Sequence, residues 1–413
     1  MESLNYFSLF FCVFFLVLSF CWNITLFDRN RLPLYYLLFI FKSLCLVYNI
    51  YCFNNSIRSV IDLGSLDIYN FLRAAEELQM FYGGDLWALL TSGGGIYPKI
   101  MALVFYLLGN RMDYMYLITF MVSLWTLRYV ILVIREMTAN DALAQNTGLF
   151  CALFPVLFTY SLQPLRECFI TFFALISFYY FIRYIKTHFL FNFIFACFLS
   201  LVAAMFHSGM VSITVSYFIC FIIFNKLSIR INPAKIIIAF FVLCLFIPLH
   251  PYCMNKFTSL KDVDSIEDFS ETRGVTKTIG NTAYIGSIPN STVGLVRVLP
   301  YLYAMFALAP LPWQIYSSGT AFAWAVDGLP QMIFMWITLC YLFRLWNEIN
   351  LIQRKYIITF LLIVSLTYFV FALGTFNYGT AMRHRAKIAP IVIIYVMIYL
   401  DNHGYLKFFS KNR

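Results

Sequence analysis

The chain has 413 residues, of which 62% are hydrophobic, 20% are aromatic and only 12% are charged. A soluble domain carries roughly 25% charged residues, so this composition excludes an ordinary soluble enzyme. The formal net charge of +10 comes from 29 Lys and Arg against 19 Asp and Glu, and the basic residues punctuate apolar segments. This pattern indicates membrane topology and contact with anionic lipid, and we expect no nucleic acid partner.

Apolar runs separated by charged or turn residues predict an all-α fold, a polytopic helical bundle with about 11 spanning helices. The expected spans cover residues 6–27, 33–53, 114–134, 147–160, 168–184, 189–206, 211–224, 236–248, 329–343, 356–373 and 388–400. The first has no basic n-region and is longer than a signal-peptide core, so we expect it to remain as a helix. Residues 1–413 are expected to form a single transmembrane domain.

Two further apolar pieces, 96–108 and 298–312, are short or interrupted by Pro and Gly. We expect each to be re-entrant or interfacial. The 11 cysteines are scattered without a C-x-x-C pair, which favours small core residues over a disulfide framework or a metal site.

Four basic loops predict the orientation of the chain in the membrane. By the positive-inside rule they are cytoplasmic, and they cover residues 183–186, 226–235, 344–355 and 407–413. Two long hydrophilic segments, 54–95 and 250–296, then lie on the outer side, the second as a large loop. The same orientation places the candidate cations discussed below on the outer face.

The stretch 377–387 places four basic or titratable side chains between two apolar segments. Because a cation is costly to keep at a membrane, such residues are functional candidates. The guanidinium groups of Arg383 and Arg385 flank His384 and suit a phosphate or pyrophosphate, which Arg binds bidentately. We therefore predict an anionic substrate, one carried on a lipid.

Two turns offer further candidates. Arg166 follows Pro164 at the start of an apolar run, where it either pairs with Glu167 or binds the substrate. His207 ends an uncharged run and is followed by Ser208 and Gly209. It is either a cap at the end of a helix or a general base or hydrogen-bonding partner for a sugar hydroxyl.

Three residues in irregular or polar segments complete the set. Arg297 and Trp313 border the segment that contains Pro310 and Pro312, where the indole either stacks on a sugar or belongs to an interfacial aromatic belt. Asp67 is one of few carboxylates expected near the outer face. It is either a helix N-cap or the base that takes a proton in a glycosyl transfer.

The order and spacing of these pieces resemble the Wzy-type O-antigen and capsule repeat-unit polymerases, including their exopolysaccharide relatives. The resemblance covers most of the chain and rests on five short motifs. They are Asp67-Ile68-Tyr69, Leu162-Gln163-Pro164-Leu165-Arg166-Glu167, Phe206-His207-Ser208-Gly209, Ala309-Pro310-Leu311-Pro312-Trp313 and Asn377-Tyr378-Gly379-Thr380-Ala381-Met382-Arg383-His384-Arg385.

This resemblance implies a multi-pass glycosyltransferase of the bacterial inner membrane that works on its periplasmic face. It would transfer a growing glycan from undecaprenyl pyrophosphate onto the next lipid-linked repeat unit without a nucleotide, a metal or another cofactor, and would act with a chain-length regulator protein. On this interpretation the catalytic candidates are His207, Asp67 and His384. The residues expected to bind the pyrophosphate or the glycan are Arg166, Arg297, Arg383, Arg385 and Trp313.

Two other functions remain open. A flippase or transporter for lipid-linked oligosaccharide would use the same cations, but it should carry charges along a path through the membrane, and here they gather at one face. An O-antigen ligase would place its key residues in one large late loop, and residues 251–296 lack a dense set of His and Arg. The chain carries no P-loop, G-x-S-x-G, H-E-x-x-H or Rossmann glycine motif, so we do not expect ATP hydrolysis.

Overall fold

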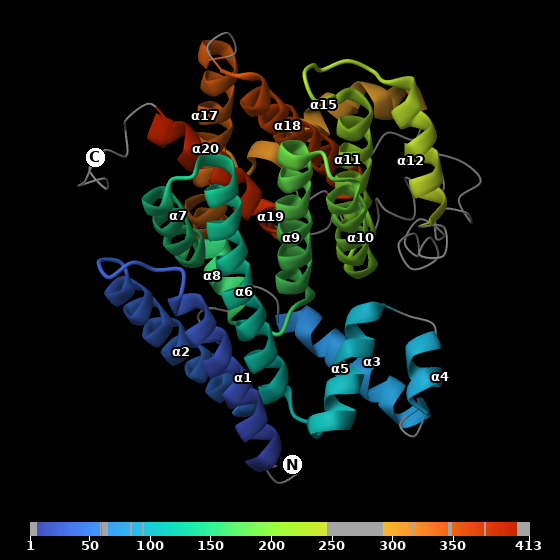
Figure 1. Ribbon diagram of the computed structural model, residues 1–413. Helices are drawn as coiled ribbons and strands as arrows, with labels where there is room; N and C mark the ends of the chain where they lie inside the picture. Colours follow the sequence, from blue (N-terminus) through green and yellow to red (C-terminus); the bar gives the residue numbers. More distant parts are fainter. Residues whose placement is uncertain are drawn as a thin grey trace. The chain divides into compact units, whose positions relative to one another are not determined.

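The secondary structure of the chain is helical throughout its described part (Figure 1). The computed structural model describes residues 6–57, 59, 65–82, 85–92, 95–245, 292–315, 317–345, 349–375 and 377–402. Within these ranges no strand is present, and an isolated antiparallel bridge joins Phe224 and Ile229. The expected all-α class is confirmed, whereas residues 250–291 of the expected outer loop lie outside the described residues.

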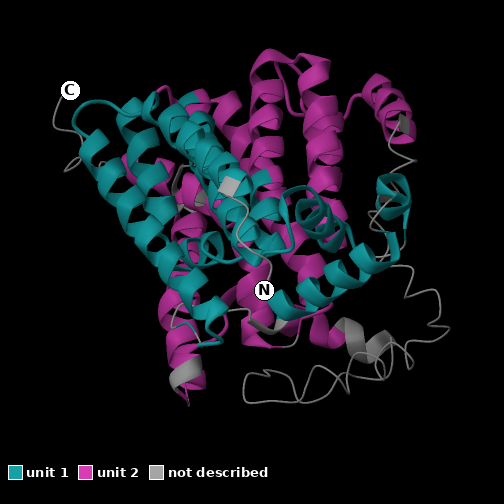
Figure 2. Ribbon diagram, turned by 90° about the horizontal axis from the view of Figure 1, so that it is seen from below, with its two compact units in different colours: residues 1–135, 140–172 teal, residues 136–139, 173–413 magenta. Residues whose placement is uncertain are grey.

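The chain divides into two compact units (Figure 2). The first contains residues 1–135 and 140–172, and the second contains residues 136–139 and 173–413. The expectation of a single transmembrane domain over residues 1–413 stays a prediction. The boundary at residue 172 falls inside α9 (Arg166–Thr187), and residues 136–138 at the end of α6 (Met112–Thr138) also belong to the second unit.

The first unit is organised around the long helix α6, to which the two N-terminal helices attach. The Asn23 side chain of α1 donates to the Leu124 carbonyl of α6 at 2.8 Å, and Phe39 of α2 packs on Phe120. Asn49 of α2 donates to the carbonyl of Leu162 at 3.1 Å. The helices of this unit before α9 are α1 (Tyr6–Ile24), α2 (Leu32–Asn54), α3 (Ser65–Tyr82), α4 (Leu86–Thr91), α5 (Ile96–Leu108), α6 (Met112–Thr138), α7 (Asp141–Leu153) and α8 (Pro155–Ser161).

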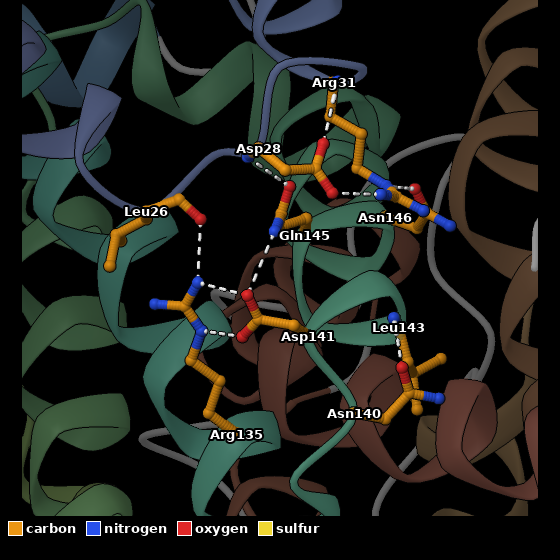
Figure 3. A network of polar contacts seen from close by, with 9 residues as sticks. All are labelled: Leu26, Asp28, Arg31, Arg135, Asn140, Asp141, Leu143, Gln145 and Asn146. Atoms are coloured by element: carbon orange, nitrogen blue, oxygen red, sulfur yellow. Dashed lines mark hydrogen bonds and ion pairs between the residues drawn. The ribbon is translucent and has the colours of Figure 1, made fainter. Parts of the chain in front are cut away.

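A polar network fastens the turn between α1 and α2 to the start of α7 (Figure 3). Arg135, near the end of α6, forms an ion pair with Asp141 and donates to the Leu26 carbonyl at 2.8 Å. Gln145 accepts from the Asp28 backbone N–H at 3.0 Å and donates to Asp141 at 3.4 Å. The network satisfies backbone groups at helix ends, which otherwise lack partners.

The second unit begins within α9 and continues to the C-terminal helix. Its helices after α9 are α10 (Leu190–Phe206), α11 (Val211–Ile223), α12 (Pro233–Leu245), α15 (Thr292–Leu308), α16 (Ser318–Ala323), α17 (Leu329–Leu345), α18 (Leu351–Ala372), α19 (Tyr378–Ala386) and α20 (Ala389–Asn402). Short turns of other helix types are η1 (Ser208–Met210), η3 (Pro312–Gln314) and the π-helical η4 (Trp324–Gly328). Residues 292–296 of the expected outer loop are therefore helical.

Helix α11 joins the core of the second unit through small hydroxyl side chains. Ser212 lies 2.8 Å from the Thr367 hydroxyl of α18, and Thr214 lies 2.7 Å from the Ser200 hydroxyl of α10. Hydroxyl groups that bond across a contact between apolar helices are typical of packing inside membranes, because small side chains let the backbones approach.

Within the described residues, six helices are long and apolar enough to cross a membrane, or seven if the bent pair α7 and α8 forms one span. The chain is therefore a helical membrane protein, but the described residues do not support the expected count of about 11 spans. The six cover 7–24, 32–54, 112–138, 166–187, 320–340 and 351–372.

Apolar runs alone overestimate the number of spanning helices, because they do not report how long each continuous helix is. The expected spans 189–206, 211–224, 236–248 and 388–400 correspond to helices of 10–17 residues in the described chain. At 1.5 Å per residue, 17 residues reach about 26 Å, short of a hydrocarbon core of about 30 Å. The expected span 147–160 is broken between α7 and α8 by a bend of 68°.

Candidate functional site

The basic stretch predicted from the sequence folds as the short helix α19 in the second unit. Asn377 is its N-cap, with the side-chain oxygen accepting from the Thr380 backbone N–H at 2.8 Å. Arg383, His384 and Arg385 occupy the last turn, where cations complement the negative end of the helix dipole. The cap therefore sets where the helix starts and thus which way each basic residue points.

His207 closes α10 and opens the next turn. Its backbone N–H bonds to the Ala203 carbonyl at 3.2 Å, and its Nδ1 accepts from the Gly209 N–H at 3.3 Å. The side chain is buried, with 9% of the residue exposed. His207 thus lies at the end of a helix, as one of its two sequence interpretations requires, and its ring also contacts other parts of the unit.

His207 and His384 meet in a cluster of three rings. Their ring centroids are 4.9 Å apart, with an edge-on arrangement. Phe371 of α18 stacks on His384 with the centroids 4.3 Å apart and lies 5.0 Å from His207. His207 at the end of α10 thus meets rings from the consecutive helices α18 and α19, and two predicted catalytic candidates lie together.

The ring cluster requires glycine at position 209, because any side chain there would collide with Phe371. A Cβ at this position would lie 2.6 Å from Cε1 of Phe371, closer than real contacts allow. The close approach lets the turn after His207 sit against the Phe371 ring. The packing explains physically why glycine follows His207 in the Phe206-His207-Ser208-Gly209 motif.

Lys387 adds a buried cation to the rings. Its Nζ lies 2.7 Å from Nδ1 of His384 and 4.9 Å from the centroid of the Phe371 ring. Lys387 is almost fully buried. An ammonium over an aromatic face is attracted by the ring quadrupole, so Phe371 stabilises the charge of Lys387.

Arg385 points into the protein, and its described contacts are internal. It donates to the backbone carbonyls of Phe306 at 2.6 Å and Ala309 at 2.7 Å, at the end of α15. It also forms an ion pair with Asp327 of η4. These bonds satisfy carbonyls at a helix C-terminus, so Arg385 fastens α19 to α15 and η4. Its expected contact with the substrate stays a prediction.

Arg383, two residues earlier, is half-buried. Desolvation by burial lowers the pKa of its guanidinium to about 10. A cation whose charge is disfavoured by burial gains more than an exposed one from a bound anion, because the anion replaces the lost solvation. Of the two arginines on α19, Arg383 is the better placed electrostatically to bind phosphate.

The side chains of Arg297 and Trp313 are more exposed to solvent than those of Arg383 and Arg385. Arg297 is exposed on α15, and Trp313 is 77% exposed in the turn η3. Trp313 thus has the free ring face that stacking on a sugar needs, and an interfacial position in a lipid headgroup layer would expose the ring equally. The alternatives for Trp313 therefore stay open.

Asp67 and Arg166 belong to the first unit, whereas the ring cluster belongs to the second unit. Asp67 is half-buried in the first turn of α3, where a carboxylate complements the helix dipole. The Arg166 guanidinium lies over the ring of Phe71, one turn further along α3, at 5.3 Å. Its Nε is 3.9 Å from the Glu167 carboxylate, so the expected pairing is present.

Three residues of the site escaped the set predicted from the sequence, namely Lys387, Phe371 and Asp327. For Lys387 a signal existed, because it lies three residues after His384 and so shares a side of the helical turn. Asp327 is a carboxylate within an apolar segment, which marks a functional or paired group. Phe371 carried no signal, since the chain holds 46 phenylalanines.

Among the described residues, no group of three or more His, Cys, Asp or Glu lies close enough to hold a metal ion. Comparisons of the chain with protein-family models, with curated proteins and with solved structures give no match.

Proposed function

We propose that this chain is a membrane glycosyltransferase that polymerises oligosaccharide repeat units carried on undecaprenyl pyrophosphate. The reaction would run on the periplasmic face of a bacterial inner membrane and build O-antigen or capsule. The observation that carries the proposal is the ring cluster of His207, Phe371 and His384 beside the half-buried cation Arg383 on α19. The motif resemblance described above supplies the reaction class.

The leaving group of this reaction is a lipid pyrophosphate, on which negative charge grows as the glycosidic bond breaks. We assign its stabilisation to Arg383, because a partly desolvated guanidinium acts strongly on a developing charge. Arg297 and Arg166 are further candidates for contacts with the pyrophosphate. Arg385 has the different task of holding α19 in place through α15 and Asp327.

The acceptor sugar must lose a hydroxyl proton and be held in position. His207, His384 and Asp67 are the candidates for these steps, and the two histidines lie together in the second unit. Trp313 is the candidate surface for stacking on a sugar ring. The reaction needs no nucleotide or metal, and a chain-length regulator protein is the proposed partner.

The test is the glycan pattern of cells in which the gene is deleted and then restored. The expected deletion phenotype is a single repeat unit on its lipid acceptor, and wild type should restore the ladder. Arg383→Ala should reduce the polymer by about 10²-fold, the usual loss of one donor to a developing oxyanion. Arg383→Lys, which keeps the charge but not the fork, should recover only part.

Arg230→Ala is the matched control, because it removes an exposed guanidinium from the turn before α12. Membrane levels of every variant are measured by immunoblot so that activity is compared per molecule. If deletion removes even the single repeat unit, the chain acts as a flippase or earlier, and the polymerase proposal is wrong. If lipid-linked polymer still forms but is not attached to its acceptor, the chain is a ligase.

A further inference from the structure

The short contact between Lys387 and His384 links the protonation of the two side chains. With Lys387 as an ammonium, which has three N–H donors and no lone pair, Lys387 donates and Nδ1 of His384 accepts, over 2.7 Å. An imidazole that accepts at Nδ1 is neutral and carries its proton on Nε2. The geometry thus defines one of the three forms that a histidine can take.

The charge of Lys387 keeps His384 in that form. The Phe371 ring lies 4.9 Å from Nζ and stabilises the ammonium through its π face. If His384 took a second proton, two positive groups would face each other over the 2.7 Å that now hold a hydrogen bond. Protonation of His384 is therefore opposed by its neighbour.

His207 shows the same arrangement at Nδ1. That atom accepts from the Gly209 backbone N–H at 3.3 Å, which a ring nitrogen can do only without its own proton. In the neutral ring the proton is then on Nε2, as in His384. The two imidazoles, 4.9 Å apart, are thus matched in tautomer.

Other charged groups on the helices packed against α19 lie further along those helices. In the described chain α15 carries Arg297, α18 carries Arg354 and Lys355, α20 carries Asp401, and α16 carries no charged residue. Lys355 is about 24 Å from Phe371 along α18, and Asp401 is about 21 Å along the chain from Lys387, at 1.5 Å per residue. His384 contacts Lys387, His207 and Phe371, while Arg385 and Asp327 are paired with each other.

We infer that Lys387 is a positioning residue that holds His384 neutral with its proton on Nε2, so that His384 donates a hydrogen bond to a phosphate oxygen of the substrate. The inference rests on the proposed function, in which pyrophosphate is the leaving group. It names the pyrophosphate as the partner of His384 and removes His384 from the candidates for the general base. Neutral imidazoles that donate to developing oxyanions are an established way of stabilising such charge.

The test is nitrogen NMR of the full-length protein in lipid nanodiscs, labelled with ¹⁵N only in histidine. The chain has five histidines, so a His384→Gln sample assigns the signals of His384 by difference. At neutral pH we expect Nδ1 of His384 without a proton and Nε2 with one. A wild-type His384 that is doubly protonated, or protonated on Nδ1, overturns the inference.

Two variants of Lys387 separate charge from packing. Lys387→Met keeps the length of the side chain without its charge, and we expect His384 to distribute its proton over both nitrogens and to become charged at a pH about one unit higher. Lys387→Arg keeps a donor cation and should retain the wild-type tautomer. If the His384 signals of Lys387→Met match those of wild type, Lys387 does not set the tautomer and the inference is wrong.

Binding and activity complete the test. Inorganic pyrophosphate should shift the Nε2 signal of His384 in wild type and less in Lys387→Met, and an unmoved wild-type signal overturns the donor role. In the polymerisation assay the acid limb of the pH profile should move up by about one unit in Lys387→Met. A loss that is equal at every pH contradicts the positioning role. If the wild-type protein does not polymerise repeat units, the proposed function is wrong. The NMR result still determines the tautomer of His384 in that case.

Discussion

Arg385 and Asp327 form an ion pair that is almost closed to solvent, with side-chain exposures of 1% and 5%. Arg385 comes from α19, and Asp327 lies in the π-helical turn η4 that precedes α17. Next to it, a Cβ on Gly328 would lie 2.8 Å from the Pro310 carbonyl, so this turn packs directly on the segment after α15. The pair therefore fixes the helix that carries Arg383 and His384.

Breaking this pair from one side should destabilise the protein strongly. Removal of one partner leaves a buried charge without compensation, at a cost of about 3–5 kcal/mol. We expect Arg385→Met to cost more than Asp327→Asn, because Arg385 also bonds two carbonyls at the end of α15. Thermal unfolding of the purified protein in detergent measures both.

The double variant Asp327→Leu with Arg385→Met is the control for this prediction. With both charges removed no buried charge is left over, so its loss should be smaller than the sum of the single losses of Asp327→Leu and Arg385→Met. Losses that simply add would mean that the two side chains do not stabilise each other.

Gly209→Ala should disrupt the ring cluster without removing any polar group. The added methyl would push against Phe371, and overpacking of this kind costs about 1–3 kcal/mol. Because Phe371 stacks on His384, polymer formation should fall as well. The second substitution Phe371→Leu should recover part of the stability by opening space.

Gly379→Ala is the matched control for Gly209→Ala. It lies on α19, where a Cβ would meet only the Asn377 side chain at 3.8 Å, an ordinary contact. Replacing glycine with alanine near a helix start should leave stability unchanged or raise it by up to about 1 kcal/mol. Equal losses in the two variants, read from thermal unfolding, would exclude the steric explanation.

His188 should make the stability of the second unit depend on pH. Desolvation first, and then the charges of Lys355, Lys235 and Lys226, lower its pKa from the ordinary value of 6.5. The folded state thus prefers the neutral ring, while the unfolded chain takes up a proton near pH 6.5. Stability is therefore complete above pH 6.5 and declines as the pH falls from there through the lower folded pKa.

The substitution His188→Asn removes this titratable group and is compatible with the local backbone conformation. His188 has a φ of 54°, a left-handed conformation that asparagine adopts more readily than most residues. The melting temperature of wild type should fall more between pH 7.5 and pH 5 than that of His188→Asn. Identical slopes would show that His188 does not titrate differently in the folded state.

Gln145 should control the turn between α1 and α2 in the first unit (Figure 3). Gln145→Leu keeps the size of this buried side chain but leaves the Asp28 N–H without its side-chain acceptor, at a cost of about 1–3 kcal/mol. Hydrogen exchange at the Asp28 amide should become faster. Gln145→Glu retains an acceptor there but faces the Asp141 carboxylate, so it should destabilise the unit more.

Parts of the fold and of the site could be predicted from local sequence. The apolar piece 96–108 coincides with α5, because Gly95 and Gly109 border it and an apolar run between glycines forms a helix of that length. The turn at His207 was predicted for a similar reason, since Ser208 and Gly209 end an apolar run. The number of spanning helices could not be predicted in this way, because hydrophobicity does not report where a helix breaks.

By itself the sequence determined that the protein is helical and lies in a membrane, and that basic residues gather in 383–387, because these properties follow from local composition and spacing. Only the tertiary structure decided that Arg385 pairs with Asp327 and that Phe371 joins His207 to His384. A charged side chain carries no local sign of its partner. Such pairings arise when helices distant in the chain pack together and exclude the water that would otherwise solvate each charge.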